Sequence, residues 1–212
     1  MMTESTASSL HSTFAKTLVV GASVSAAFVD RNPTKRFLSS LGLLGGSMTH
    51  AQGGAPGARV LSSLKRSVLD QVTAVIALDL LFWDSVIGLG DPREAKAFLK
   101  GFFKELRARG LPILIGRVPG FHALQIYRDE LNEAIENEVR AHREAGFAAV
   151  VVPLDQLFER ANEDEGVHID GRHHRLEDLI PDGLHPGPIA AEYIARELGN
   201  CAALLAARTR SA

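Results

Sequence analysis

Short runs of apolar residues alternate along this sequence with longer segments in which apolar residues recur every three or four positions. A short, continuous apolar run is typical of a strand that is buried on both faces in a parallel sheet. The longer pattern is typical of a helix with one buried face. The alternation therefore predicts an α/β fold, a three-layer α/β/α sandwich with a mostly parallel central sheet. The predicted strands are Thr17–Gly21, Val72–Leu78, Leu111–Gly116 and Ala148–Val152.

Several predicted helices carry residues that typically begin or end a helix. Asp91-Pro92-Arg93-Glu94 places an acceptor at the cap, a proline in the first turn and a glutamate three residues after the cap. Gly110 and Gly146 stand where glycine commonly ends a helix. The predicted helices are Ala58–Gln71, the segment from Asp91 to Gly110, His122–Ala145, Leu154–Ala161 and Pro188–Arg208.

The segment between the first strand and residue 58 has a less definite pattern. We expect a short helix or loop over Ala26–Arg36, broken at Asn32-Pro33. Phe37–Leu44 is predicted as a second strand, although its pattern is ambiguous. A glycine-rich loop is expected to follow it through Gly57.

Composition narrows the class of protein. The chain has 212 residues, 46% of them hydrophobic, and shows no repeat or linker, which predicts a single domain over residues 16–212. Residues 1–15 are predicted to be a disordered tail. The formal net charge is −2 with acidic and basic residues interspersed, so no nucleic-acid partner is expected. The single cysteine, Cys201, excludes an internal disulfide framework and is predicted to be a small core residue.

The sequence also bears on location. No segment approaches the ~18 consecutive apolar residues of a membrane span. The opening Met1–Lys16 lacks an apolar core of the length that a signal peptide needs. We therefore expect a soluble cytoplasmic protein, and the sequence leaves the oligomeric state open.

Ser23 is the first candidate for chemistry. It lies two residues beyond the end of the first predicted strand, at the carboxyl edge where open α/β folds place their ligands. A hydroxyl in this position can be exposed and still be held rigidly. The alternative is an ordinary turn between a strand and a helix, with Ser23 as the helix cap.

The second candidate is the stretch Ile180-Pro-Asp182-Gly-Leu-His185-Pro-Gly187. Asp182 and His185 are three residues apart, so one turn can bring them to the same side. A carboxylate there can accept the imidazole Nδ1 proton and leave Nε2 as a base. The alternative is a helix start capped by Asp182, with His185 on the surface.

Ser23, Asp182 and His185 follow one another in the order serine, acid, base and could meet at one edge of the sheet. In the usual α/β-hydrolase, however, the serine lies in Gly-x-Ser-x-Gly and the acid lies far from the histidine. Here Ser25 stands in place of the second glycine, and the acid and the base share one turn. From Thr17 to about Arg196 the chain resembles the SGNH (GDSL-type) hydrolase superfamily, a flavodoxin-like sandwich. The most specific match is Asp182-Gly-Leu-His185-Pro. The resemblance implies that Ser23 is the nucleophile, with Ala22 in place of the usual aspartate, and that Asp182 and His185 are the acid and the base.

The two middle blocks of the resemblance concern the oxyanion. Gly45 matches the second-block glycine whose amide helps to bind it, with Gly46 as the nearest alternative. The third block departs from the expected Gly-x-Asn-Asp, because Asp79 occupies the position of the donating asparagine. An ionised carboxylate only accepts hydrogen bonds and would repel an oxyanion.

Three roles remain open for Asp79. Burial can keep its carboxyl protonated and able to donate, or Asp79 can have a structural role or a substrate-binding role. In a substrate-binding role, the following Leu80–Asp84 would help to line the pocket. The alternative is that Phe82 and Trp83 simply belong to the core.

The resemblance implies a serine hydrolase that cleaves a small carboxylic ester through an acyl-enzyme, with amides of Ser23 and Gly45 binding the oxyanion. It implies no metal and no organic cofactor. The alternatives are a weak or inactive ligand-binding protein of the same fold, and an acyltransferase. A nucleotide-binding role is disfavoured because the Gly21 turn lacks a phosphate-binding motif. No metal site is expected at His168, His173 and His174.

Overall fold

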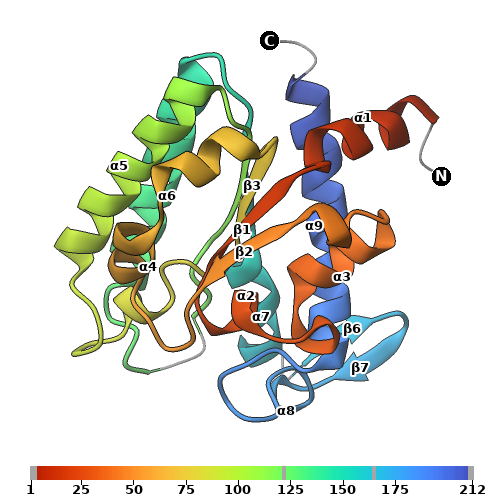
Figure 1. Ribbon diagram of the computed structural model, residues 1–212. Coiled ribbons are helices and arrows are strands. Elements are labelled where there is room, and N and C mark those ends of the chain that lie inside the picture. Colours follow the sequence, from red (N-terminus) through yellow and green to blue (C-terminus); the bar gives the residue numbers. More distant parts are fainter. Residues whose placement is uncertain (1–3, 121–122, 164–165, 210–212) are drawn as a thin grey trace.

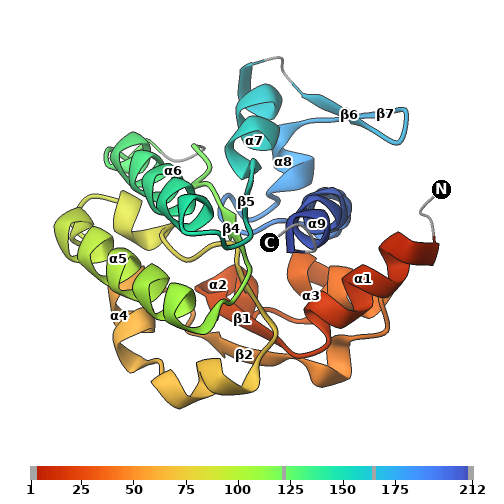
Figure 2. The same ribbon diagram turned by 90° about the horizontal axis from the view of Figure 1, so that it is seen from above.

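The computed structural model describes residues 4–120, 123–163 and 166–209. Within these ranges, five parallel strands form one sheet in the order β2-β1-β3-β4-β5. Helices cover both faces of the sheet (Figures 1 and 2), which confirms the predicted three-layer α/β/α sandwich. The strands are β1 (Thr17–Gly21), β2 (Met48–Ala51), β3 (Ala74–Ala77), β4 (Ile113–Gly116) and β5 (Ala149–Val152).

The central strands β3 and β4 are apolar throughout because both of their faces are covered. In β3, Ala74 and Ile76 pack into one hydrophobic core, whereas Val75 and Ala77 pack into the other. This division follows from the alternation of side chains along a strand. The first core lies under α1 (Glu4–Phe14), α3 (Pro33–Ser40), α7 (Leu154–Glu163) and α9 (Pro188–Thr209), and the second under α4 (Gly57–Ser63), α5 (Pro92–Arg109) and α6 (Arg128–Glu144).

The helix signals in the sequence act as expected in α5. The Asp91 carboxylate accepts a hydrogen bond from the amide of Arg93 at 2.8 Å, and Gly110 ends the helix at a left-handed φ of 64°. The structure begins α6 at Arg128, later than the predicted His122, which itself lies outside the described residues. The predicted helix after residue 57 is divided into α4 and the 3-10 helix η3 (Arg66–Gln71). Cys201 is buried in α9, as predicted.

The predicted strand Phe37–Leu44 is wrong. Asn32 accepts a hydrogen bond from the amide of Lys35 at 3.0 Å, and Pro33 opens α3, which buries Phe37 and Leu38. The second strand is instead β2, inside the predicted loop. It is an edge strand that pairs with β1 alone and is only partly buried, so its sequence has no apolar run.

The disordered tail predicted for residues 1–15 is wrong from Glu4 to Phe14, where the structure has α1. Leu10 and Phe14 are four residues apart and therefore lie on one helix face. Both are buried, with exposed fractions of 1% and 0%. α1 lies beside α9 in both views (Figures 1 and 2), and Ser9 donates to the carbonyl of Ala206.

Three short elements near the C-terminal end were not predicted. β6 (Val167–Ile169) and β7 (Arg172–His174) form an antiparallel hairpin, and α8 (Leu176–Leu179) follows it. Asp170-Gly171 makes the hairpin turn, with φ angles of 53° and 75°, as is typical of an Asp-Gly turn. In the described part of the chain, every helix is too short or too polar to cross a membrane.

Candidate active site

The structure places Ser23 at the carboxyl end of β1. It is the first residue of the short helix α2 (Ser23–Ala26) and is partly exposed. Ala22 is the N-cap of α2, and its side chain makes no capping hydrogen bond. Ser23 is therefore not the cap of this helix, which removes the simplest structural explanation for a serine at this position.

Asp182 and His185 form a direct hydrogen-bonded pair. The Nδ1 atom of His185 lies 2.9 Å from Oδ2 of Asp182. The other carboxylate oxygen, Oδ1, accepts from the amides of Leu184 at 3.0 Å and His185 at 2.6 Å. Gly183, with a φ of 73°, makes the tight turn that allows these contacts. Because α9 begins only at Pro188, Asp182 does not act as its cap.

Electrostatics set the protonation of this pair. The hydrogen bond from the His185 amide, together with those from the His185 ring and the Leu184 amide, lowers the pKa of Asp182 to about 2. Asp182 is therefore ionised at neutral pH and can only accept, so a neutral His185 ring donates from Nδ1. Nε2 is then the basic nitrogen of the ring.

The loop that carries this pair and the turn that carries Ser23 lie at the same end of the sheet. α2 and the start of α9 both lie at the lower side of the sheet in Figure 1. α9 also contacts the 3-10 helix η1 (Val29–Arg31), which follows α2. Arg36 joins the segments, because its guanidinium binds Glu192 of α9 at 2.9 Å and the carbonyl of Asp30 at 2.8 Å.

Gly45 lies at the opposite end of the sheet, so its predicted role as an oxyanion donor is wrong. It belongs to the 3-10 helix η2 (Leu44–Gly46), which precedes β2. Because β2 runs parallel to β1, the residues before it lie beside the start of β1. Consistent with this, a Cβ on Gly46 would lie 2.5 Å from the carbonyl oxygen of Ala15. Strand residues rise by about 3.3 Å each, so Gly45 is beyond hydrogen-bond reach of Ser23.

Asp79 follows β3 and points its carboxyl at the turn that carries Ser23. Oδ2 accepts from the amides of Val24 at 2.8 Å and Ser25 at 3.3 Å, and Oδ1 accepts from the Ser25 hydroxyl. Burial raises the pKa of Asp79, although the hydrogen bonds from Ser25 and Val24 oppose that shift. Both oxygens therefore bind the turn rather than a site for the oxyanion, and the structural role is the one that fits these contacts.

Comparison with solved structures identifies the fold. The chain is similar to a lipase/acylhydrolase from Enterococcus faecalis, with a TM-score of 0.65 and 15% identity over 91% of this chain and 96% of that one. A lipolytic protein of the G-D-S-L family from Desulfitobacterium hafniense has a TM-score of 0.64 and 10% identity over 88% and 99%. Esterase EstA from Pseudoalteromonas sp., inhibited by monoethylphosphonate, has a TM-score of 0.60 and 15% identity over 88% and 95%.

This chain has the SGNH hydrolase fold. No protein-family model and no curated protein sequence matches it. The likeness therefore lies in the arrangement of the sheet and its helices.

The loop after β2 lies at the same edge of the sheet as Ser23, because β2 runs parallel to β1. The amide of Gln52 donates to the carbonyl of Gly21 at 3.1 Å, so this loop begins directly beside the end of β1. Gly53 and Gly54 follow and are exposed, at the same edge as Ser23. The glycine pair Gly53-Gly54 is visible in the sequence, but its position at this edge follows only once β2 is known to be Met48–Ala51.

The residues after Asp79 belong mainly to the core of the SGNH fold. Leu80, Leu81 and Phe82 are buried, and Phe82 packs edge-on against Trp83 with ring centroids 5.2 Å apart. Asp84 is completely buried and accepts a hydrogen bond from the amide of Gly57 at the start of α4. This segment therefore connects the loops that follow β2 and β3.

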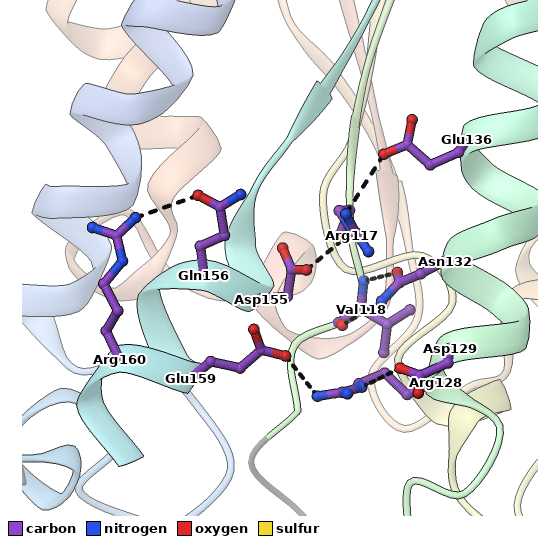
Figure 3. Close-up of polar contacts among 10 residues, drawn as sticks. All are labelled: Arg117, Val118, Arg128, Asp129, Asn132, Glu136, Asp155, Gln156, Glu159 and Arg160. Carbon is purple, nitrogen blue, oxygen red and sulfur yellow. Dashed lines mark hydrogen bonds and ion pairs between the residues drawn. The ribbon is translucent and has the colours of Figure 1, made fainter. Parts of the chain in front are cut away.

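A network of charged residues supports the loops that follow β4 and β5 (Figure 3). Arg117, just after β4, pairs with Asp155 of α7 at 3.0 Å and with Glu136 of α6 at 3.7 Å. Arg128 pairs with Glu159 at 2.8 Å. Figure 3 also shows the Asn132 side chain bonded to the backbone of Val118. Because the charges are paired, this network connects α6 and α7 rather than offering an open site.

The histidines of the hairpin form a pair and not a triad. His168 and His173 are directly opposite across β6 and β7, with ring centroids 5.2 Å apart. Within the described ranges, no group of three or more histidine, cysteine, aspartate or glutamate residues is arranged to hold a metal ion.

Proposed function

We propose that this protein is a carboxylic-ester hydrolase that uses Ser23, Asp182 and His185 and forms an acyl-enzyme. The observation that carries the proposal is the contact between His185 Nδ1 and Asp182 Oδ2 at 2.9 Å, which leaves Nε2 as a base. The similarity in fold to lipases and esterases supports it. The substrate class is a small-molecule ester.

In the proposed reaction, His185 Nε2 takes the proton from the Ser23 hydroxyl as Oγ attacks the ester carbonyl. The alcohol leaves with that proton, and a water molecule then releases the acid from Ser23. The ionised Asp182, whose pKa is about 2, stabilises the imidazolium that forms in both steps. The chain's own side chains and amides carry every step.

The oxyanion is proposed to bind two backbone amides. One belongs to Ser23, at the start of α2. We assign the other to Gly53, which follows Gln52 at the edge beside Gly21. The side-chain donor expected in the third block is absent, because Asp79 is turned toward α2. Loss of one such donor typically lowers turnover by about 100- to 1,000-fold, so we expect a slow enzyme.

The test combines turnover with covalent labelling. We expect a burst of p-nitrophenol from a short-chain p-nitrophenyl ester, and labelling of Ser23 by a fluorophosphonate probe. Ser23→Ala should abolish both, whereas Ser62→Ala, at an exposed serine of α4, should leave both unchanged. A folded wild-type protein that shows neither burst nor labelling contradicts the proposal.

One observation favours a second function, that of a ligand-binding protein of the same fold. Asp79 replaces the side-chain donor that the third block supplies to the oxyanion. A binding protein would take up an ester or a carboxylic acid without hydrolysing it. Saturable binding of a short-chain ester by a folded protein that resists labelling would favour this function over the hydrolase.

A further inference from the structure

We propose that Asp79 is a positioning residue for Ser23, because its carboxyl supplies, from β3, the helix cap that Ala22 cannot supply. The inference rests on the proposed function, in which Ser23 is the nucleophile. It concerns how the serine is held and assigns Asp79 no contact with the substrate.

The amides at the start of α2 need an acceptor. The second and third residues of a helix usually donate to the side chain of the N-cap residue. Here the N-cap is Ala22, whose side chain has no hydrogen-bond acceptor and makes no capping hydrogen bond. The Val24 and Ser25 amides bond instead to Oδ2 of Asp79, at 2.8 and 3.3 Å. Asp79, 55 positions from Val24 in the sequence, thus acts as the N-cap acceptor of α2.

The fit around this carboxyl is close. A Cβ on Gly21 would lie 2.1 Å from Oδ1 of Asp79 and 2.3 Å from Oγ of Ser25, so only glycine leaves room for the contact. Ser25 is itself buried, with an exposed fraction of 1%, and its hydroxyl donates to Oδ1. The carboxyl therefore binds the turn at three points.

The turn is also held from the side of α3. The Asn32 side chain, which is completely buried, donates to the carbonyl of Ser25 at 2.9 Å. Its oxygen accepts from the amide of Lys35 at 3.0 Å. Ser23 thus lies in a turn held by Asp79 on one side and Asn32 on the other. Removing either contact should let the nucleophile move relative to His185.

The experiment compares Asp79→Ala with Asp79→Asn. Alanine removes the acceptor, and we expect fluorophosphonate labelling of Ser23 to slow by about 10- to 100-fold, since small misplacements of reacting groups have effects of this size. The loss should fall on kcat and not on KM. Asparagine keeps an oxygen for the amides and can donate to Ser25 Oγ, so it should keep at least the wild-type labelling rate.

The matched control is Asp91→Ala, which removes the carboxylate cap of α5. It should lower thermal stability but leave the labelling rate unchanged. Equal labelling rates in folded Asp79→Ala and wild type would overturn the proposal. So would an Asp79→Asn variant as slow as Asp79→Ala, because the charge and not the hydrogen bonds would then matter.

Hydrogen exchange separates this proposal from the proposed function. The Val24 and Ser25 amide protons should exchange slowly in the wild type and in Asp79→Asn, and at least tenfold faster in Asp79→Ala. This result is expected even if the wild type is never labelled, in which case only the hydrolase proposal fails. If Asp79→Ala does not fold, rapid exchange of both amides in Asp79→Asn, together with wild-type labelling, would overturn the positioning role.

Discussion

Three aspartates show how strongly surroundings control a carboxyl group in this protein. Amide and imidazole donors lower the pKa of Asp182 to about 2, whereas burial raises the pKa of Asp79. Burial also raises the pKa of Asp84 to about 6, against the hydrogen bond from Gly57. Asp182 is therefore suited to stabilise a cation, whereas Asp79 and Asp84 are suited to hold backbone amides in place.

At this scale we predict a pH-dependent stability from Asp84. Its folded pKa of about 6 lies above the ordinary value of 3.8, so its contribution is fully present below pH 3.8 and is lost as pH rises through 6. The shift corresponds to roughly 3 kcal/mol. Relative to the wild type, Asp84→Asn should therefore become more stable as the pH rises from 4 to 7.

Urea unfolding at pH 4 and at pH 7 measures this difference in the free energy of unfolding. Ser62→Ala, at an exposed serine of α4, changes no titratable group and is the control, and its difference from wild type should not change with pH. A difference between Asp84→Asn and wild type that stays constant, or that shrinks as pH rises, would contradict the prediction.

At the scale of elements, apolar patterns alone placed some segments correctly and misplaced others. α5 begins and ends where its cap residues indicate. α3 was mistaken for a strand because Phe37 and Leu38 are buried in a helix of only eight residues, too short to display a period. α1 leaves a weak pattern because few of its residues are apolar, although two of them, Leu10 and Phe14, are buried against the rest of the protein.

We predict that α1 is part of the folded core. Phe14 is completely buried and packs edge-on against Phe37, with ring centroids 5.5 Å apart. Phe14→Ala should lower the free energy of unfolding by about 3–5 kcal/mol, as is typical of a buried phenylalanine. Ser12→Ala, at an exposed position of the same helix, should change it little. Equal unfolding midpoints for Phe14→Ala and wild type would mean that α1 does not pack as described.

At the scale of the whole molecule, the parallel sheet brings the loops of the candidate site together. Every strand of a parallel sheet ends at the same edge, so loops distant in sequence meet there. The turn after β1, the loop after β2 and Asp79 after β3 are joined by hydrogen bonds at this edge. Gly45 precedes its strand and is therefore at the other edge.

This arrangement predicts different effects for two glycine substitutions. Gly53→Pro removes the amide proposed to bind the oxyanion and should lower kcat by on the order of 100-fold. Gly45→Pro removes an amide at the opposite edge and should leave kcat unchanged. Neither glycine has a positive φ in the described structure. The measurement is kcat for a p-nitrophenyl ester in both variants, with unfolding midpoints recorded to show that both are folded. Equal losses of kcat in the two variants would contradict the assignment of Gly53.

The sequence by itself determined the α/β class, four of the strands, the capped helices and the pairing of Asp182 with His185. These features depend either on residues that are neighbours in the chain or on strands that are buried on both faces. Either cause leaves a pattern in adjacent positions of the sequence. The tertiary structure decided the position of β2, the packing of α1, the glycine that shares an edge with Ser23, and the target of the Asp79 carboxyl. An edge strand is only half covered, and the contact between Asp79 and Val24 spans 55 residues, so neither leaves a signal in adjacent positions.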